Sequence, residues 1–267
     1  MSKILFIGDV IGKPGRQALR EVLPQWRQEY QPDAVVVNVE NLAHGKGVTI
    51  NTITNIEDLN IDCYTSGNHV FDKKDQSTAA FEKYNNLIRP ANYPNGLPGH
   101  GYYRFSKGGQ QYLIINLNGQ VFFEKQFEGQ ISSPFKAIDD ILTQQAQKGD
   151  IILIDFHSEA SSEKQAFGYY CDGRVTAVLG THTHVPTADA RLLPKGTAYI
   201  GDVGMTGPIN SVIGVKIENS LNIFLGRGKF VMEPEEEGPI MVNGVLIETN
   251  SQGKATSIQK LYKEING

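Results

Sequence analysis

The sequence predicts an α/β domain, and two observations lead to this prediction. Short apolar runs bounded by turn residues recur along the chain, and their length and β-branched content are typical of buried strands. Amphipathic stretches with helix start and stop signals separate several of these runs. Strands that alternate with helices indicate a domain whose strands pair at least partly in parallel.

The elements follow one another along most of the chain. A strand at 4–7 is followed by a helix over about 14–31, because Pro14 suits a first helical turn and Pro32 ends the helical pattern. Further helices are predicted at about 73–84 and 133–147, and further strands at 34–37, 112–115, 151–154, 175–179, 197–200 and 241–247.

The segment 205–238 differs from the rest of the chain. It holds a glycine- and proline-containing loop, a predicted short helix and the acidic run 233–237. The segment is too short to bury a core of its own. We therefore predict one domain over 1–267, in which 205–238 is a lid or an oligomer contact.

Composition excludes several classes of protein. The 267 residues include 25 Lys and Arg against 29 Asp and Glu, a net charge of −4 without a long basic block, which argues against binding a long nucleic acid. No apolar run approaches the roughly 18 residues that a membrane span requires, so we expect a cytoplasmic protein without a membrane partner. Two cysteines far apart cannot build a disulfide framework. The composition is compatible with binding of a small phosphorylated ligand.

Side chains that can bind metal ions follow five of the apolar runs directly. In an open α/β sheet, ligands bind beyond the carboxyl ends of the strands, so these side chains would converge on one place. A mixture of imidazole, carboxylate and amide groups suits divalent iron, manganese or zinc. The candidates at the run ends are Asp9, Glu40, Asn41, Asn68, His69, His157, His182 and His184.

Each candidate has a structural alternative when it is taken alone. Asp9 could cap a turn, Asn68 is a common turn residue, and a lone histidine is more often a hydrogen-bonded structural residue. The pair His182-x-His184 is more specific, because two imidazoles at this spacing point to the same side of an extended segment. Taken together, the five segments favour a shared site. Glu40 is the candidate carboxylate for bridging two cations.

Three other polar residues carry weaker signals. His44 and His100 lie in glycine-containing loops, where exposure explains them without a ligand. Asp202 ends another predicted strand and could support the site, although a turn is the simpler interpretation.

The motifs together resemble the calcineurin-like metallophosphoesterases, and in particular their YmdB-type branch. The similarity extends over nearly the whole chain, although Ile11 stands where the superfamily usually has a histidine. The motifs are Gly8-Asp9, Asn38-x-Glu40-Asn41, Gly67-Asn68-His69, Asp155-Phe-His157-Ser-Glu-Ala160, Gly180-Thr-His182-Thr-His184 and Asp202-Val-Gly-Met-Thr-Gly207.

The resemblance implies a fold of two packed mixed β-sheets flanked by α-helices, and a likeness to proteins that form oligomers. It also implies two metal ions, for which iron and manganese are the family's cations and zinc is an alternative. Asn41 would take over the ligand position that Ile11 leaves empty. The implied ligand sets are Asp9, Glu40, Asn41 and His184 for one ion, and Glu40, Asn68, His157 and His182 for the other.

The implied activity is a phosphodiesterase that hydrolyses cyclic nucleotides, notably 2′,3′-cyclic AMP. We expect two cations to generate a hydroxide that attacks phosphorus in line. His69 would act as the general acid, because an imidazole is protonated and still a competent acid near neutral pH. A phosphomonoesterase or nuclease on the same centre, and a regulatory nucleotide- or partner-binding protein with a structural metal, are the alternatives.

Overall fold

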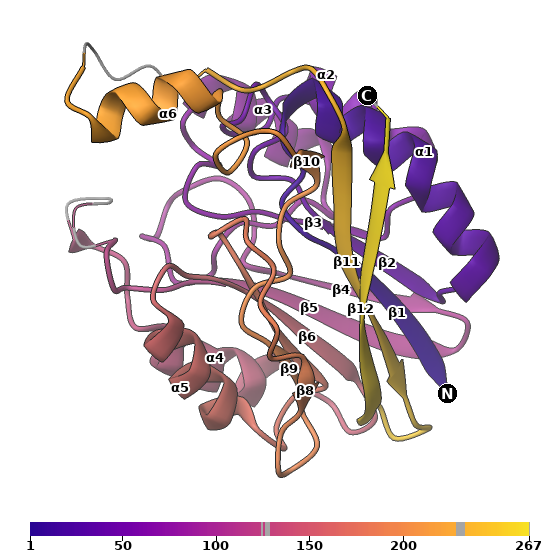
Figure 1. The fold of residues 1–267 in the computed structure, drawn as a ribbon. Coiled ribbons are helices and arrows are strands. Elements are labelled where there is room, and N and C mark those ends of the chain that lie inside the picture. The colour runs from indigo at the N-terminus through magenta and orange to yellow at the C-terminus, as the bar shows by residue number, and fades with distance from the viewer. Residues whose placement is uncertain (124, 126–128, 228–232, 267) are drawn as a thin grey trace.

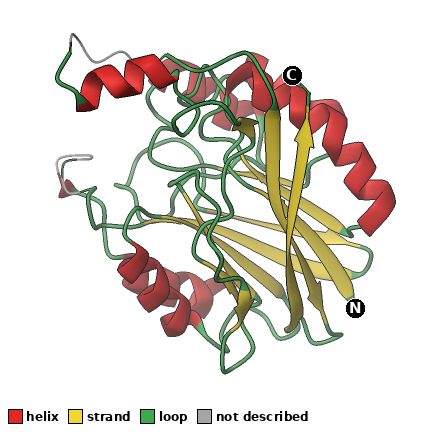
Figure 2. Ribbon diagram, viewed as in Figure 1, coloured by secondary structure: helices red, strands yellow, loops and turns green. Residues whose placement is uncertain are grey.

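The computed structural model describes residues 1–123, 125, 129–227 and 233–266. In this part of the chain, two six-stranded sheets pack against each other (Figure 1). Helices cover the outer face of each sheet (Figure 2). The predicted fold of two mixed sheets flanked by helices is thus confirmed. Among the described helices, none combines the length and apolar character needed to cross a bilayer.

The first sheet has the strand order β10-β11-β1-β2-β3, and β12 pairs with β11 outside this path. β1 pairs in parallel with β2, as does β2 with β3, whereas β11 is antiparallel to β1. Its strands are β1 (Ser2–Ile7), β2 (Ala34–Asn38), β3 (Cys63–Thr65), β10 (Gly207–Pro208), β11 (Ile240–Thr249) and β12 (Ala255–Ile265).

The second sheet has the strand order β4-β5-β6-β7-β9-β8. Its four inner strands are parallel, and the edge strands β4 and β8 are antiparallel to their neighbours. Its strands are β4 (Tyr102–Lys107), β5 (Gln110–Asn118), β6 (Ile151–His157), β7 (Ala177–Thr181), β8 (Arg191–Leu192) and β9 (Ala198–Ile200).

The helices fall on opposite sides of the sheet pair. α1, α2 and α3 lie over the first sheet, α4 and α5 lie over the second, and α6 projects from the body of the molecule (Figure 1). The helices are α1 (Gly12–Tyr30), α2 (Ile50–Thr54), the 3₁₀ helix η1 (Glu57–Leu59), α3 (Lys74–Lys83), α4 (Pro134–Gln145), α5 (Ser161–Cys171) and α6 (Ile217–Phe224).

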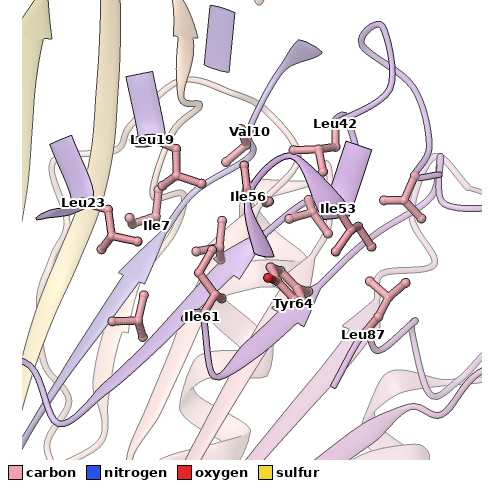
Figure 3. Close-up of a cluster of buried hydrophobic side chains, with 14 of the residues drawn as sticks. Ile7, Val10, Leu19, Leu23, Leu42, Ile53, Ile56, Ile61, Tyr64 and Leu87 are labelled. Atoms are coloured by element: carbon pink, nitrogen blue, oxygen red, sulfur yellow. The ribbon is translucent and has the colours of Figure 1, made fainter. Parts of the chain in front are cut away.

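Alternation along the strands explains why whole strands are buried. In β1, Leu5 and Ile7 belong to the cluster under the helices of the first sheet, part of which is drawn in Figure 3. Ile4 and Phe6 point the other way and pack against the second sheet. Both faces of β1 are therefore apolar, and such a strand appears in the sequence as an unbroken apolar run.

The predicted strands and helices are present, and the structure adds elements that the sequence patterns do not indicate, chiefly β4, α5 and β12. Within the segment 205–238, Gly207 and Pro208 form β10 of the first sheet, and the short helix is α6. Residues 228–232 of this segment lie outside the described residues.

Candidate metal centre

The two sheets bring their carboxyl ends together at one site. Asp9 follows β1, Glu40 follows β2 and Asn68 follows β3 in the first sheet. His157 is the last residue of β6, and His182 follows β7 in the second sheet. These segments are far apart in sequence, so the site exists only when both sheets have packed.

Three side-chain atoms surround Nε2 of the fully buried His157. They are Asn68 Oδ1 at 2.8 Å, His182 Nδ1 at 3.0 Å and Glu40 Oε2 at 3.1 Å. A single imidazole nitrogen makes one hydrogen bond, so mutual hydrogen bonding cannot satisfy this whole set. The four atoms instead form a cluster of ligand-type groups that converge on one point.

A second group shares Glu40 with the first. Ligand atoms of Asp9, Glu40 and His184 lie within 4.8 Å of one another, as do those of Glu40, His157 and His182. Asn41 Nδ2 lies 3.1 Å from Glu40 Oε1 and 3.0 Å from His184 Nε2, so the Asn41 amide belongs to the same group.

One oxygen of the second group lacks a partner. Asp9 is fully buried, and its Oδ2 accepts a hydrogen bond of 3.2 Å from the backbone N–H of His182. Asp9 Oδ1 has no hydrogen-bond partner among the described residues. An unsatisfied buried carboxylate oxygen is costly. A cation at this position would satisfy it, so the residues present fit a metal ion.

Hydrogen bonds fix which nitrogen each imidazole turns toward the centre. Thr181 Oγ1 donates its only hydrogen to Asp155 Oδ1 at 2.6 Å. It therefore accepts the Nδ1–H of His157 at 2.9 Å, which leaves the lone pair of His157 Nε2 facing Glu40 and Asn68.

The same argument applies to the other two histidines. The carbonyl oxygen of Ile213 can only accept, so it takes the Nδ1–H of His184 at 2.8 Å and leaves the Nε2 lone pair facing inward. Glu159 Oε2 lies 3.1 Å from His182 Nε2, which leaves the lone pair of His182 Nδ1 facing inward. All three imidazoles are thus held as a metal ion requires them.

Buried polar groups beneath the site connect the two sheets. Asn38 Oδ1 accepts the backbone N–H of Glu40 at 3.0 Å, and Asn38 Nδ2 donates to Asp155 Oδ2 at 2.8 Å. Asp155 also accepts from Thr65 and Thr181. Burial raises the pKa of Asp155 to about 6 despite these donors. Asp155 therefore connects Asn38, which holds the backbone of Glu40, to Thr181, which holds the imidazole of His157.

Asp202 does more than end a strand, contrary to the simpler interpretation of the sequence. Its buried Oδ2 accepts from the backbone N–H and hydroxyl of Thr183 at 3.0 and 2.8 Å, and from Lys164 Nζ at 2.7 Å. Thr183 separates His182 from His184, which have φ values of 98° and 66°. The spacing of the two histidines suggested an extended segment, but the backbone is left-handed at both of them. This conformation is strained, and the Asp202 contacts support it.

The buried groups respond electrostatically to one another. Burial raises the pKa of Asp9 well above its usual range, and the negative charges of Glu40, Asp202 and Asp155 add to this effect. Burial, followed by the neighbouring His157, lowers the pKa of His182 to about 2. Neutral imidazoles beside crowded carboxylates are the state in which a metal ion binds these groups.

His69 lies beside this cluster and belongs to neither group of ligand atoms. Its backbone N–H donates to Glu40 Oε2 at 3.3 Å, and its Nδ1 is 2.8 Å from Asp72 Oδ2. Burial alone would lower the pKa of His69, but the hydrogen bond to Asp72 and the charge of Glu40 outweigh burial and raise it.

A pocket of about 210 Å³ opens over the centre. His69 and several of the ligand-type residues line it, together with His44 and Lys46 from the loop that follows β2. Ile11, Ile213, Val215 and Pro234 supply its apolar lining.

Sequence reasoning gave no role to two residues of this site. Asp72, three positions after His69, and Glu159, two positions after His157, each hold an imidazole nitrogen. A carboxylate a few positions from a candidate histidine is the signal that could have identified them.

Comparisons with known proteins identify the family of the chain. The sequence profile of the YmdB-like protein family matches residues 5–261. The chain is 42% identical over 260 residues to the 2′,3′-cyclic-nucleotide 2′-phosphodiesterase of Bacillus subtilis, and the match covers 97% of this chain and 96% of that protein.

Two crystal structures are similar over nearly their whole length. A hypothetical protein from Thermus thermophilus is 37% identical with a TM-score of 0.89, and the match covers 98% of this chain and 99% of that one. A protein from Mycoplasma pneumoniae described as a novel phosphatase is 34% identical with a TM-score of 0.89, covering 100% of this chain and 95% of that one. The chain therefore belongs to the YmdB-like family of calcineurin-like metallophosphoesterases.

Proposed function

We propose that this chain hydrolyses nucleoside 2′,3′-cyclic phosphates, such as 2′,3′-cyclic AMP, at two bound metal ions. Its broader class, a metal-dependent phosphodiesterase, follows from its named relatives. The finer proposal is supported by the substrate in the name of the Bacillus subtilis relative. The observation that carries it is that two groups of ligand atoms share the single carboxylate of Glu40.

Asp9, Glu40, Asn41 and His184 would hold one ion, and Glu40, Asn68, His157 and His182 would hold the other. Nitrogen and oxygen donors without a thiolate suit iron, manganese or zinc, and we propose iron or manganese because of the family to which the chain belongs. Bound cations polarise phosphate oxygens and make water a stronger nucleophile near neutral pH.

His69 would protonate the leaving oxygen. Water supplies the oxygen that joins phosphorus, the bond from phosphorus to O2′ breaks, and the nucleoside 3′-phosphate is the product. Because Asp72 holds Nδ1 of His69, Nε2 is the nitrogen that can give its proton to O2′. The raised pKa of His69 keeps this proton in place near neutral pH.

The test substitutes His69 and compares metal content with turnover. His69→Ala should retain its metal, measured by elemental analysis, and lose turnover of 2′,3′-cyclic AMP by about 10²–10⁴-fold, because only proton transfer is removed. His182→Ala should lose metal as well as turnover. The matched control is His100→Ala, which removes an exposed imidazole outside the centre. Normal hydrolysis by His69→Ala would contradict the assignment.

A second candidate function is phosphomonoester hydrolysis on the same centre. One relative from Mycoplasma pneumoniae carries the name putative phosphatase/phosphodiesterase, and is 37% identical over 94% of this chain. Rates with 2′,3′-cyclic AMP, 3′-AMP and a short RNA on one preparation would distinguish the two activities and a nuclease. Faster hydrolysis of 3′-AMP than of the cyclic substrate would favour the phosphatase.

A further inference from the structure

We propose that Ile213 forms the nucleobase subsite of the pocket, with Ile11, Val215 and Pro234 behind it. This inference rests on the proposed function, because it names the part of the pocket that would recognise the base of a nucleotide. The ligand chemistry is a planar, largely apolar ring joined through ribose to a phosphate.

The backbone around Ile213 forms a two-residue turn. Val212 and Val215 exchange two backbone hydrogen bonds, at 2.9 and 3.0 Å. Both central residues have positive φ, 49° at Ile213 and 97° at Gly214. Such turns strongly favour asparagine, aspartate or glycine at both central positions. Glycine at the second position follows this preference, whereas isoleucine at the first does not.

The unfavourable conformation of Ile213 therefore needs an explanation. A β-branched residue in the left-handed region is a true outlier, and such outliers concentrate at functional sites. Burial accounts for only part of the residue, because Ile213 remains 47% exposed. Partial burial does not explain a β-branched residue in this backbone conformation, so a role in binding accounts better for its presence.

The position of the turn next to the metal centre is fixed. The Ile213 carbonyl accepts the Nδ1–H of His184 at 2.8 Å, so the residue that carries the apolar side chain is hydrogen-bonded to a proposed metal ligand. Gly214 lies tightly on Ile11, because a Cβ atom at position 214 would come within 2.8 Å of the Ile11 side chain. The turn is thus seated on another apolar residue of the same pocket.

The pocket lining combines two kinds of side chain. Groups that bind cations and phosphate, including Glu40, His69 and His182, line the same pocket as the four apolar residues. A bare phosphate would use only the polar groups. A nucleotide would use both, because its phosphate would lie at the metal centre while its base covers the apolar side chains and removes them from water.

The experiment measures binding rather than turnover. Calorimetry on metal-loaded protein compares 3′-AMP with glycerol 2-phosphate, which is a monophosphate without a base, while released phosphate is monitored to correct for hydrolysis. The wild type should bind 3′-AMP more tightly. Ile213→Asn keeps the backbone carbonyl, and asparagine tolerates the left-handed conformation. This variant should lower the affinity for 3′-AMP by about tenfold and the affinity for glycerol 2-phosphate by less than about twofold.

Two further variants complete the test. Ile213→Gly should act like Ile213→Asn, which excludes a new hydrogen bond from asparagine as the cause. Leu192→Asn is the matched control, because Leu192 is 41% exposed on β8 and does not line this pocket. It should bind both ligands as the wild type does.

The results that overturn the inference are distinct from failure of the proposed function. Equal affinity of the wild type for both ligands, no change in the Ile213 variants, or an equal loss for both ligands would overturn it. If the wild type prefers 3′-AMP and the variants lose this preference, but no cyclic nucleotide is hydrolysed, the subsite stands and the proposed reaction fails.

Discussion

At the scale of single residues, carboxylates set the properties of the histidines that they contact. Asp72 raises the pKa of His69 by a hydrogen bond of 2.8 Å, against the effect of burial. Glu159 instead fixes the orientation of His182, whose low pKa keeps it neutral. Similar pairs thus have opposite uses: one histidine retains a proton and the other offers a lone pair.

Asp72→Asn should move the pH dependence of turnover. A general acid must be protonated, so activity falls as pH rises through the pKa of His69. Removing the Asp72 charge lowers that pKa, and the alkaline limb of kcat/KM for 2′,3′-cyclic AMP should move to lower pH. Asp75→Asn, which changes an exposed aspartate on α3, should leave the limb in place. An unmoved limb in Asp72→Asn would contradict the role given to this pair.

The proposed ligands could be predicted from local patterns, whereas their supports could not. Asp9 and Glu40 stand directly after apolar runs, which a reader of the sequence can see. Asp202, which supports the histidine segment, is held by Lys164, which lies 38 positions earlier on α5. Such a contact depends on how distant elements pack, and no local spacing encodes it. The left-handed backbone at His184 is equally invisible in the sequence.

At the scale of elements, α5 shows why a helix can escape sequence-based prediction. Its apolar face is weak, and it contains Gly168, which usually disfavours a helix. The structure explains this glycine, because a Cβ atom there would come within 2.6 Å of the Tyr199 ring. α5 can therefore lie close to the second sheet, where it carries Lys164 to Asp202.

Lys164→Met should destabilise the protein. Lys164 is 3% exposed and Asp202 is fully buried, so the substitution leaves a buried carboxylate without its cation. We expect the free energy of unfolding in urea to fall by about 3–5 kcal/mol. Lys148→Met, at an exposed lysine, is the control. Adding Asp202→Asn to Lys164→Met should recover part of the loss, and a loss below about 1 kcal/mol in Lys164→Met would contradict this interpretation.

α6 carries an uncovered apolar face. Ile217, Leu221 and Phe224 recur at helical spacing and are 45%, 50% and 84% exposed. Large exposed apolar side chains that share a face are typical of an interaction surface. We propose that this face contacts a second copy of the chain, which is the oligomer-contact alternative for 205–238.

Light scattering can test this contact. Leu221→Asp combined with Phe224→Asp should reduce the solution mass to that of the monomer, because two charges would be buried in the contact. Leu192→Asp, a similarly exposed leucine on β8, should leave the mass unchanged. A wild type that is already monomeric would contradict the proposal.

At the scale of the whole molecule, the proposed metal centre joins two sheets that also meet through an apolar cluster and through the hydrogen bonds of Asp155. The carboxylates come from the first sheet and the three histidines from the second. Without cations, Asp9 is a buried carboxylate near Glu40, Asp155 and Asp202. The charges needed for binding metal therefore act against the stability of the metal-free fold.

Asp9→Asn should stabilise the metal-free protein. The raised pKa means that the folded state holds the Asp9 proton more tightly than the unfolded state does. Protonation of Asp9 therefore stabilises the fold at low pH, and this stabilisation is lost as pH rises through the pKa of Asp9 in the folded state. At pH 8 the chelator-treated variant should melt about 5 °C or more above chelator-treated wild type, and the gap should narrow as pH falls to about 4.

Metal should reverse this order. After reloading with manganese, wild type should melt above Asp9→Asn, because only wild type regains the full ligand set. Asp140→Asn, at an exposed aspartate on α4, should follow wild type with and without metal. The expectation is contradicted if metal-free Asp9→Asn is less stable than metal-free wild type at pH 8. In that case Asp9 stabilises the metal-free fold.

The strand order of the first sheet also bears on how the chain is made. β1 lies between β2, which follows it closely, and β11, which comes more than 200 positions later. During synthesis one edge of β1 therefore stays unpaired until β11 has left the ribosome. An exposed apolar edge is prone to pairing with other chains. The nascent protein thus passes through a long interval in which a chaperone that shields strand edges would help it most.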